Sequence, residues 1–512
     1  HSEGKLAFSA DGGWRNNQWQ GVIQDLSLRD TRAGNWQATQ TIQLKASAQS
    51  FSSSQICLVN AEHAELCAQP TWSKTAGLSI DGSLQRVPLV MAKPWLPKDL
   101  QLPGIVNADY QFAQRGGKPV AQVQIRLPDS SITFKDAKGK TETLNYNNAS
   151  AHLQLNDRNL DIQAQLELRS YGQIRADGQV TLSPQDGRHR LNMRVTTDMP
   201  DIGWMAKFSP QIDQLKGQLN SDFTISGALP YPAITGMLRF TNGSVYLPET
   251  GATLTNMQLT LQAVGADRAT LNGSLRAGNG NLTATGTISL ADLANWQADV
   301  NLQGNNLKLM DTYEAQIWVS PNLAIAATPK HVNITGNVDI PEAIITLNEL
   351  PPTANKLSDD VVIVGRRAPA QKASPKQVVD DSIITQPNVT VTVGNNVKFS
   401  GFGVDAKLNG RLQILNTRQV IIAQGVLNVV DGVYKAYGQN LTIERGRLLF
   451  NGPMDNPGLD VRAVREVEEE ATVGIELSGT LQKPESTLFS NPTMSQTDIL
   501  SYLLTGRPLS AL

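Results

Sequence analysis

The sequence predicts an all-β protein, built as a long curled antiparallel sheet that forms an elongated, U-shaped hydrophobic groove, with a few short helices. Three observations support this prediction. Apolar and polar residues alternate along most of the chain, and pairs of turn-forming residues separate the alternating runs. Hydrophobic residues make up 40% and aromatic residues 5% of the 512 residues, spread evenly, which indicates the absence of a single thick core.

The stretch 216–263 contains the pattern that recurs elsewhere in the chain. In its first strand Leu219, Phe223 and Ile225 share one face. Asn242-Gly243 then predicts a two-residue hairpin turn, with Phe240 facing Val245. On the same geometry Leu238 would face Leu247.

A second copy of this pattern follows Asn409. Asp431-Gly432 predicts another hairpin turn, with Val429 facing Tyr434. The spacing between copies is irregular, so the pattern does not indicate a solenoid of fixed period.

The chain divides into four predicted regions. Residues 1–349 form the first part of the groove, and residues 387–490 continue it. Between them, residues 350–386 contain prolines and paired charges with little alternation, which is typical of a disordered surface excursion. Residues 491–512 form a short capped amphipathic helix and then end, and we interpret this end as truncated.

Two helical segments are predicted. Residues 201–208 break the period of two and could form about two helical turns before Pro210. Near the end of the chain, Ser495 and Asp498 form a capping box, and Gly506 followed by Pro508 stops the helix. Its predicted apolar stripe is Ile499, Leu500, Leu503 and Leu504.

Cys57 and Cys67 are the only cysteines, each within a strand-like run. Their spacing favours a disulfide across a hairpin, and a pair of buried free thiols is the alternative. A disulfide would indicate an oxidising compartment.

The sequence offers no candidate for catalysis, metal binding or a cofactor. The histidines at 1, 63, 152, 189 and 331 are isolated, and we interpret them as ordinary sheet residues. The aspartate pairs at 359 and 380 lie in the predicted excursion, which cannot hold a general acid in place. Nucleophile-elbow and phosphate-binding motifs are absent, so we expect a protein that is not an enzyme.

Charge and hydropathy exclude two further classes. The net charge of -2 with mixed signs gives no reason to expect nucleic acid as a partner. No apolar run reaches the roughly 20 residues needed to cross a bilayer as a helix. Because the chain starts at His1 without a Met, we interpret it as an excised piece whose targeting segment lies upstream.

A sheet of this size with one apolar face must cover that face. It can pack a second sheet, close into a barrel, or curl around something apolar. A membrane barrel would need aromatic girdles, which 5% aromatic residues do not supply. Packing of two sheets as a β-sandwich is possible for parts of the chain. Curling suits a long array of similar strands, and roughly 30 strands at ~4.8 Å each would extend on the order of 140 Å.

The apolar positions of the strands are the candidate groove lining. They are Leu160, Ile162, Leu166, Leu219, Phe223, Ile225, Leu238, Phe240, Val245, Leu247, Leu259, Leu261, Ile288, Val300, Leu302, Val332, Ile334, Val338, Ile340, Val389, Val391, Leu412, Val429, Leu441, Ile475 and Leu477.

Three segments resemble the TamB family, the inner-membrane-anchored subunits of bacterial translocation and assembly modules. They are Asp-Asp-Val-Val-Ile-Val-Gly at 359–365, Ser-Gly-Thr-Leu-Gln-Lys-Pro at 478–484, and Ser-Gln-Thr-Asp-Ile-Leu-Ser-Tyr-Leu-Leu-Thr-Gly-Arg-Pro at 495–508. The cysteine pair followed by Trp72 fits the family pattern too. The resemblance covers essentially the whole chain.

The resemblance implies a periplasmic location and kinship with AsmA-like bridge proteins that carry lipid in a hydrophobic β-groove. It also implies an inner-membrane anchor N-terminal to this chain, and an outer-membrane barrel partner, TamA, that is met through a C-terminal region beyond Leu512. Two functions follow as hypotheses. One is a bridge that shields phospholipid acyl chains between the two membranes. The other is a scaffold or chaperone whose strand edges assist outer-membrane β-barrel and autotransporter assembly. Persistent alternation favours the bridge, and an elongated structural spacer is a third interpretation.

Overall fold

A computed structural model gives the structure of the chain. It describes residues 4–31, 34–91, 101–136, 139–183, 188–229, 232–265, 267–289, 295–347, 384–401, 403–417, 420–436, 438–467 and 471–507. Most of the predicted excursion, residues 350–383, lies outside the described residues, as do residues 508–512. Residues 384–386, which we assigned to that excursion, begin strand β25 (Ile384–Gly401).

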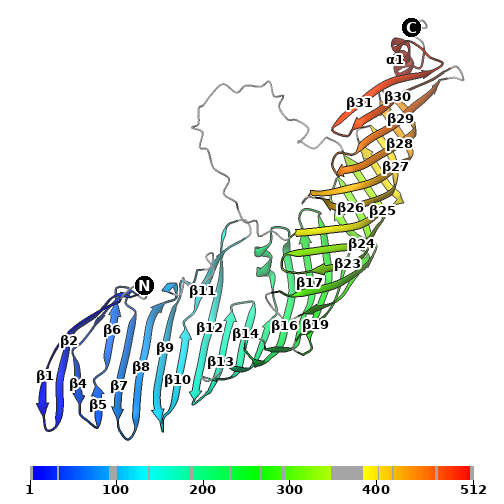
Figure 1. Ribbon diagram of the computed structural model, residues 1–512. Coiled ribbons are helices and arrows are strands. Elements are labelled where there is room, and N and C mark those ends of the chain that lie inside the picture. The colour runs from blue at the N-terminus through cyan, green and yellow to red at the C-terminus, as the bar shows by residue number, and fades with distance from the viewer. Residues whose placement is uncertain are drawn as a thin grey trace, which may run out of the picture. The chain divides into compact units, whose positions relative to one another are not determined.

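The described residues confirm the all-β prediction, because 31 strands are assigned to one mixed sheet and helices are few (Figure 1). The chain divides into two compact units. Unit 1 contains residues 1–243 and 258–269, and unit 2 contains residues 244–257 and 270–512. The predicted U-shaped closure of the whole array stays a prediction.

Unit 1 is built from short and medium strands in antiparallel pairs, most of them between strands that are consecutive in the chain. Its elements are β1 Lys5–Arg15, β2 Gln18–Thr31, β3 Gly34–Ala38, β4 Ile42–Ala46, β5 Ser50–Ser53, β6 Ile56–Asn60, β7 Glu65–Ser73, β8 Gly77–Pro88, β9 Ile105–Arg115, β10 Lys118–Leu127, β11 Ser130–Lys135, β12 Thr141–Asn156, β13 Asn159–Leu168, β14 Gly172–Thr181, β15 Arg190–Met199, the 3-10 helix η2 Gly203–Phe208 and β16 Asp213–Ala228.

Unit 2 contains longer strands. Its elements are β20 Gly280–Ser289, β21 Gln297–Asn305, β22 Leu307–Asp311, β23 Ala315–Ala327, β24 His331–Leu347, β25, β26 Val404–Thr417, β27 Val420–Ala436, β28 Gln439–Pro453, β29 Gly458–Val467, β30 Ala471–Thr480, β31 Lys483–Asn491 and the helix α1 Gln496–Thr505. The strands β17 Ala233–Leu247, β18 Ala252–Ala263 and β19 Arg268–Ala277 contribute residues to both units.

The prediction of a purely antiparallel sheet is wrong at one pair. β24 and β25 run parallel, with Gly336 beside Val389 and Val338 beside Val391. A parallel pair cannot be joined by a tight hairpin and needs a long crossover connection. The two strands are separated in the sequence by residues 348–383, which lie outside the described residues.

The two predicted hairpin turns are also wrong. β17 continues through Asn242 and β27 continues through Asp431, and both residues have positive φ, +53° and +51°. Positive φ within a strand is typical of a β-bulge, in which one extra residue is inserted without reversing the chain. The bulge in β27 shifts the side-chain alternation by one position, so Val429 and Tyr434 pack against the same cluster although no turn joins them.

Both helical predictions are confirmed in position. Residues 203–208 form η2, although as a 3-10 helix, and residues 496–505 form α1. The Ser495 side chain accepts a hydrogen bond from the Asp498 N–H, and Gly506 ends the helix in the left-handed conformation with φ +77°. The predicted stripe was partly wrong, because Ile499, Tyr502 and Leu503 are buried whereas Leu500 and Leu504 are 37% and 44% exposed. The sheet meets a narrower face of the helix than the sequence suggested.

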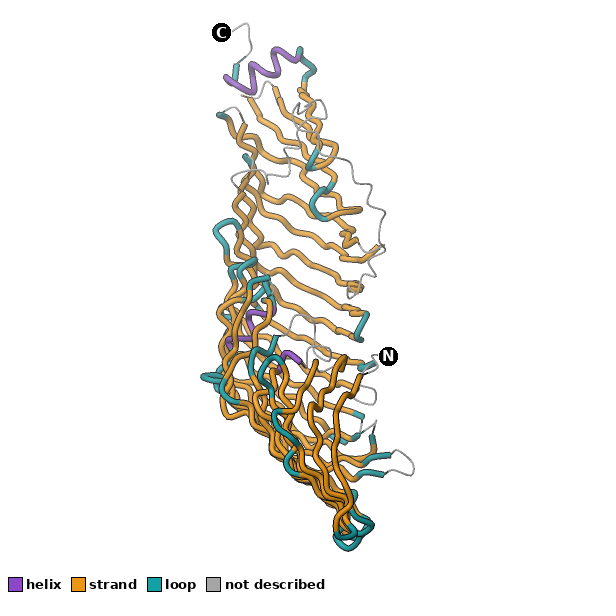
Figure 2. The backbone as a smooth tube through the Cα atoms, turned by 90° about the vertical axis from the view of Figure 1, so that its left-hand side faces the viewer, coloured by secondary structure: helices purple, strands orange, loops and turns teal. Residues whose placement is uncertain are grey.

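Fully buried apolar side chains gather in small clusters instead of one core. In unit 2 the α1 side chains Ile499 and Leu503 pack with Leu441 and Ile475 of the sheet. Figure 2 shows the backbone of α1 in purple beside the C-terminus. In unit 1 a cluster around Tyr146, Leu168 and Met199 receives side chains from η2. In these two clusters a helical segment covers part of the apolar face.

Candidate apolar ligand-binding face

The strand register in unit 1 aligns the apolar positions into rows that cross the sheet. We define three rows by directly opposed residues. The first row is Leu58, Leu66, Leu84, Ala108, Ile125, Ala151, Ala164, Ala176, Val195 and Phe223; the second is Ile56, Ala68, Gly82, Tyr110, Val123, Leu153, Ile162, Gly178, Met193 and Ile225; the third is Pro70, Ile80, Phe112, Ala121, Leu155, Leu160, Val180, Leu191 and Gly227.

The first two rows each cross ten strands, β6 to β10 and β12 to β16, without a charged residue. At ~4.8 Å between strands, nine steps correspond to roughly 43 Å of continuous apolar surface. Alternation along one strand predicts an apolar face. Only the register shows that the apolar faces of successive strands coincide without a break.

The opposite face of the same strands is polar. One row of directly opposed residues consists of Gln69, Asp81, Gln111, Gln122, Gln154, Asp161, Gln179, Asn192 and Ser226. All of these except Ser226 are exposed. The sheet in unit 1 thus has one wet face and one apolar face.

The degree of burial distinguishes this apolar face from a packed core. Every residue in the second and third rows is half-buried. The inner face of a β-sandwich would be closed by a second sheet about 10 Å away, and its side chains would be fully buried. These residues are shielded by their neighbours on the same face and leave part of their surface open to a ligand.

Unit 2 has the same organisation across eight strands. The row formed by Ala284, Leu302, Leu323, Gly336, Val389, Ile414, Ala423 and Gly452 passes from β20 to β28. It crosses the parallel pair β24–β25 without losing its apolar character. A parallel crossover therefore leaves the apolar face continuous in this unit.

The predicted lining residues are all on described strands, and most of them are half-buried. Val245, Val389, Leu412, Leu441 and Ile475 are buried. Leu441 and Ile475 lie under α1, so they belong to a closed cluster and are not open lining. Leu166, Leu219 and Phe240 pack against the cluster that η2 joins.

Sequence reasoning missed several members of the rows. In the second and third rows only Leu160, Ile162 and Ile225 were among the candidates, and Tyr110, Phe112, Val123 and Met193 are four of the members that were not. The same alternation identifies them, because each is separated from the next apolar residue by a polar one.

Tyr110 illustrates how the face is kept smooth. Its ring lies over the opposed Gly82, where an added Cβ would come within 2.3 Å of the ring. Its hydroxyl donates a hydrogen bond to the Cys67 carbonyl oxygen at 2.9 Å, and partial burial raises its pKa. A glycine opposite a large ring lets the ring lie flat along the sheet.

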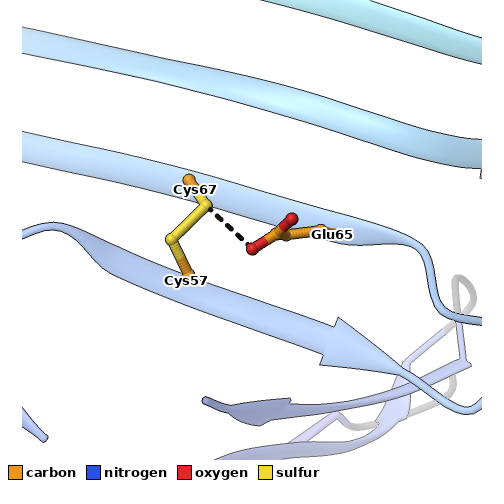
Figure 3. Close-up of side chains that lie close together, drawn as sticks. All are labelled: Cys57, Glu65 and Cys67. Atoms are coloured by element: carbon orange, nitrogen blue, oxygen red, sulfur yellow. Dashed lines mark hydrogen bonds between the residues drawn. A yellow bond between two sulfur atoms is a disulfide. The ribbon is translucent and has the colours of Figure 1, made fainter. Parts of the chain in front are cut away.

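Cys57 and Cys67 are directly opposed on β6 and β7, with Cα atoms 4.1 Å apart, and their sulfur atoms are joined in the geometry of a cross-strand disulfide (Figure 3). Both lie on the face opposite to the apolar rows, beside Glu65. This geometry favours the disulfide over two free thiols. Sulfur atoms in a disulfide are not thiolates, so the grouping with Glu65 does not indicate a metal site.

The carboxyl groups with shifted pKa values stand in ion pairs. The Arg194 guanidinium, 2.6 Å from Asp222, lowers the pKa of that carboxyl through its hydrogen bonds. Arg447 and Arg445 do the same for Asp460. These pairs link neighbouring strands on the polar side of the sheet.

Two family models match this chain. The family model described as the TamB N-terminal domain matches residues 2–240, and the model described as the TamB C-terminal domain matches residues 267–512. The chain belongs to the TamB family. Together the two family models match nearly all of it, and both describe domains of the same protein.

A curated TamB relative is the "Translocation and assembly module subunit TamB" of Haemophilus influenzae. It is 25% identical over 513 residues, which cover 96% of this chain and 38% of the relative. The chain therefore spans less than half the length of that TamB protein. Within the described residues, no helix is both long enough and apolar enough to cross a bilayer.

Proposed function

We propose that this TamB-family chain is part of a periplasmic lipid-transfer bridge, which shields phospholipid acyl chains on its apolar face between the inner and outer membranes. The observation that carries the proposal is the set of uninterrupted, half-buried apolar rows in unit 1. The protein acts by binding and not by catalysis.

The energetics favour an acyl ligand. Each methylene that leaves water for such a face gains about 0.8 kcal/mol, and the rows offer no polar partner that a headgroup would need. The acyl chains would lie along the rows while the headgroups stay in water. A sequence of equivalent apolar steps also lets a ligand shift from strand to strand without a deep energy minimum.

The location and partners belong to the same proposal. The family membership supports a place in the translocation and assembly module, with the inner membrane on one side and the outer-membrane barrel TamA on the other. The disulfide geometry is compatible with the oxidising periplasm.

Site-specific photo-crosslinking in cells tests the binding. A photoreactive amino acid at Ile162 or Met193 should give adducts with phospholipid acyl chains, whereas the adjacent polar-face positions Gln163 and Arg194 should not. Equal adducts on both faces, or adducts on neither, would contradict the proposal.

A scaffold for protein assembly is the second candidate, and β1 favours it. This strand hydrogen-bonds to β2, and its residues are exposed, including Leu6, Phe8 and Trp14 at 59%, 55% and 72%. Exposed strands with apolar side chains can pair with a client strand. Adducts to unfolded outer-membrane proteins at Phe8, with no lipid adducts at Ile162, would favour the scaffold.

A further inference from the structure

The 3-10 helix η2 lies across the apolar face of unit 1 near one end of the strands. The chain leaves β15 at Met199, forms η2, and returns in β16 at Asp213. In Figure 1, η2 is the short green coil beside the ends of β11 and β16. It therefore reaches back over strands that precede it by several positions in the sheet.

Aromatic side chains attach η2 to those strands. Phe208 stacks on Phe134 of β11, with ring centroids 4.6 Å apart. Trp204 meets Phe208 edge-on at 5.7 Å and lies 6.5 Å from Tyr171, which follows β13. One short segment thus contacts side chains from two distant parts of the sheet.

An ion pair adds a second attachment. Lys207 Nζ lies 2.5 Å from Glu142 Oε2 of β12, and Lys140 Nζ lies 3.1 Å from the other oxygen of the same carboxyl group. The Glu142 side chain is only 14% exposed. The hydrogen bonds from Lys207 first, and then from Lys140, hold the pKa of Glu142 below its ordinary value.

The segment covers the next step of the apolar rows. On β13 the positions after Ile162 and Ala164 are Leu166 and Leu168, and Leu166 is directly opposed to Ile174 of β14. Leu166 and Ile174 pack against the buried cluster that Trp204 and Met205 of η2 also join. The apolar residues that precede Leu166 on β13, namely Ala164, Ile162 and Leu160, are not part of that cluster.

The covering segment itself is weakly held. It is a 3-10 helix of six residues, a form with poorer hydrogen-bond geometry than an α-helix. None of its residues is fully buried, and Phe208 is 54% exposed. At its start the Asp201 carboxylate accepts a hydrogen bond from the Gly203 N–H at 2.8 Å, in an exposed position. A short 3-10 helix without a fully buried residue is typical of segments that open locally at low free-energy cost.

We propose that η2 is a displaceable strap, held by the Lys207–Glu142 ion pair and the Phe208–Phe134 stack, which must move before an acyl chain can occupy the step formed by Leu166 and Ile174. The identity of the ligand rests on the function proposed above, whereas the movement of the strap is independent of that function.

The first experiment measures, without lipid, how accessible the residues beneath the strap are to a thiol reagent. In the full chain, Ile174→Cys is labelled with a maleimide, and Leu160→Cys at the open end of the same face is the reference. Lys207→Glu, which places like charges together, and Phe208→Ala should each raise the labelling rate at position 174 severalfold and leave position 160 unchanged. Lys216→Glu, the same charge change at an exposed residue of β16, should have no effect.

The second experiment adds the ligand. A photoreactive residue placed at Ile174 or at Ile162 forms adducts with any phospholipid that binds there. The adducts are compared in two forms of the protein. In one form Lys207→Glu releases the strap, and in the other a short thiol crosslinker between Lys207→Cys and Glu142→Cys locks it. Release should increase adducts at 174, and locking should abolish them, while adducts at 162 stay constant.

The outcomes separate the two proposals. If neither Lys207→Glu nor Phe208→Ala changed the labelling rate at position 174, the strap proposal would be wrong. Equal amounts of lipid adduct at position 174 in the locked and released forms would also contradict it. Strap-dependent labelling with no lipid adduct at either 162 or 174 would retain the strap and overturn the lipid-binding function.

Discussion

Individual glycines set how closely aromatic side chains can lie on the sheet. An added Cβ at Gly82 would lie 2.3 Å from the Tyr110 ring, at Gly217 2.2 Å from the Phe240 ring, and at Gly474 2.5 Å from the Phe489 ring. At these three glycines a neighbouring ring, and not a turn, leaves no room for a side chain, and Gly217 also has a positive φ of +147°.

Gly82→Ala should displace Tyr110 and break its hydrogen bond to the Cys67 carbonyl oxygen. We expect a loss of about 1–3 kcal/mol in unfolding free energy, the range for an overpacked site. Gly13→Ala is the matched control, because an added Cβ there meets no atom within 4 Å. Thermal denaturation compares the two, and equal melting temperatures would show that the ring accommodates the methyl group.

The disulfide between Cys57 and Cys67 should be present in protein exported to the periplasm. Alkylation without reductant should then add no mass to the intact protein, and alkylation after reduction should add two alkyl groups. Alkylation of both residues in unreduced periplasmic protein would establish free thiols instead.

Asp460 should make the stability of unit 2 depend on pH. Because Arg447 and Arg445 hold its pKa below the ordinary value of about 4, the folded state favours the charged form. This contribution is complete above about pH 4 and is lost as pH falls through the lowered pKa of the folded state. Asp460→Asn should lower the melting temperature at pH 7 and reduce the further decrease upon acidification.

The control for this pH effect is Asp299→Asn, which changes an exposed aspartate on β21. It should reproduce the melting profile of the unmodified chain. If Asp460→Asn showed the same acid-induced decrease as the unmodified chain, the two arginines would not be the source of the pH dependence.

Among the elements, α1 is held at both ends and along one face. Ser495 caps its start, and the Arg465 guanidinium of β29 donates to the Tyr502 and Leu503 carbonyl oxygens at 3.1 and 3.2 Å. A cation at a helix C-terminus also interacts favourably with the helix dipole. The helix thus closes the apolar face over β30 and β31 far more firmly than η2 closes its own site.

Two leucines of α1 provide a matched test. Leu503 is 0% exposed and Leu500 is 37% exposed. Leu503→Ala should cost about 2–5 kcal/mol and detach the helix, whereas Leu500→Ala should change stability by less than about 0.5 kcal/mol. Hydrogen exchange of the amides in 499–505 reports detachment, and similar protection in both variants would mean that packing does not hold α1.

For the molecule as a whole, the proposed function predicts that stability and transport can be separated. Ile334→Asp places a charge on the half-buried apolar face of β24, and Asn333→Asp places one on the exposed face beside it. A charge on an open face can contact water in the absence of lipid, so Ile334→Asp should fold. It should still obstruct lipid delivery, because an unpaired carboxylate among acyl chains is costly.

Thermal unfolding and lipid delivery to the outer membrane, measured together, decide this prediction. Loss of folding in Ile334→Asp but not in Asn333→Asp would indicate a closed core and favour the structural spacer. Normal lipid delivery with failed autotransporter assembly in a folded Ile334→Asp variant would favour the scaffold.

The sequence by itself determined the strand character of most of the chain, the alternating faces of the strands and the ends of α1. Side-chain alternation with a period of two and the capping of a helix end are local properties, so Ile162 could be placed on the apolar face and Ser495 at a helix start without knowledge of any partner. The same local signals predicted a break in the sheet at 201–208.

Only the tertiary structure decided how these pieces meet. A positive-φ Asn or Asp is compatible with a tight turn or with a bulge, and pairing to neighbouring strands selected the bulge at Asn242 and Asp431. The parallel pairing of β24 with β25, and the burial of Leu441 and Ile475 under α1, likewise depend on residues distant in sequence. Strand partners and covering segments are chosen by the free energy of long-range contacts, which alternation along a single strand does not contain.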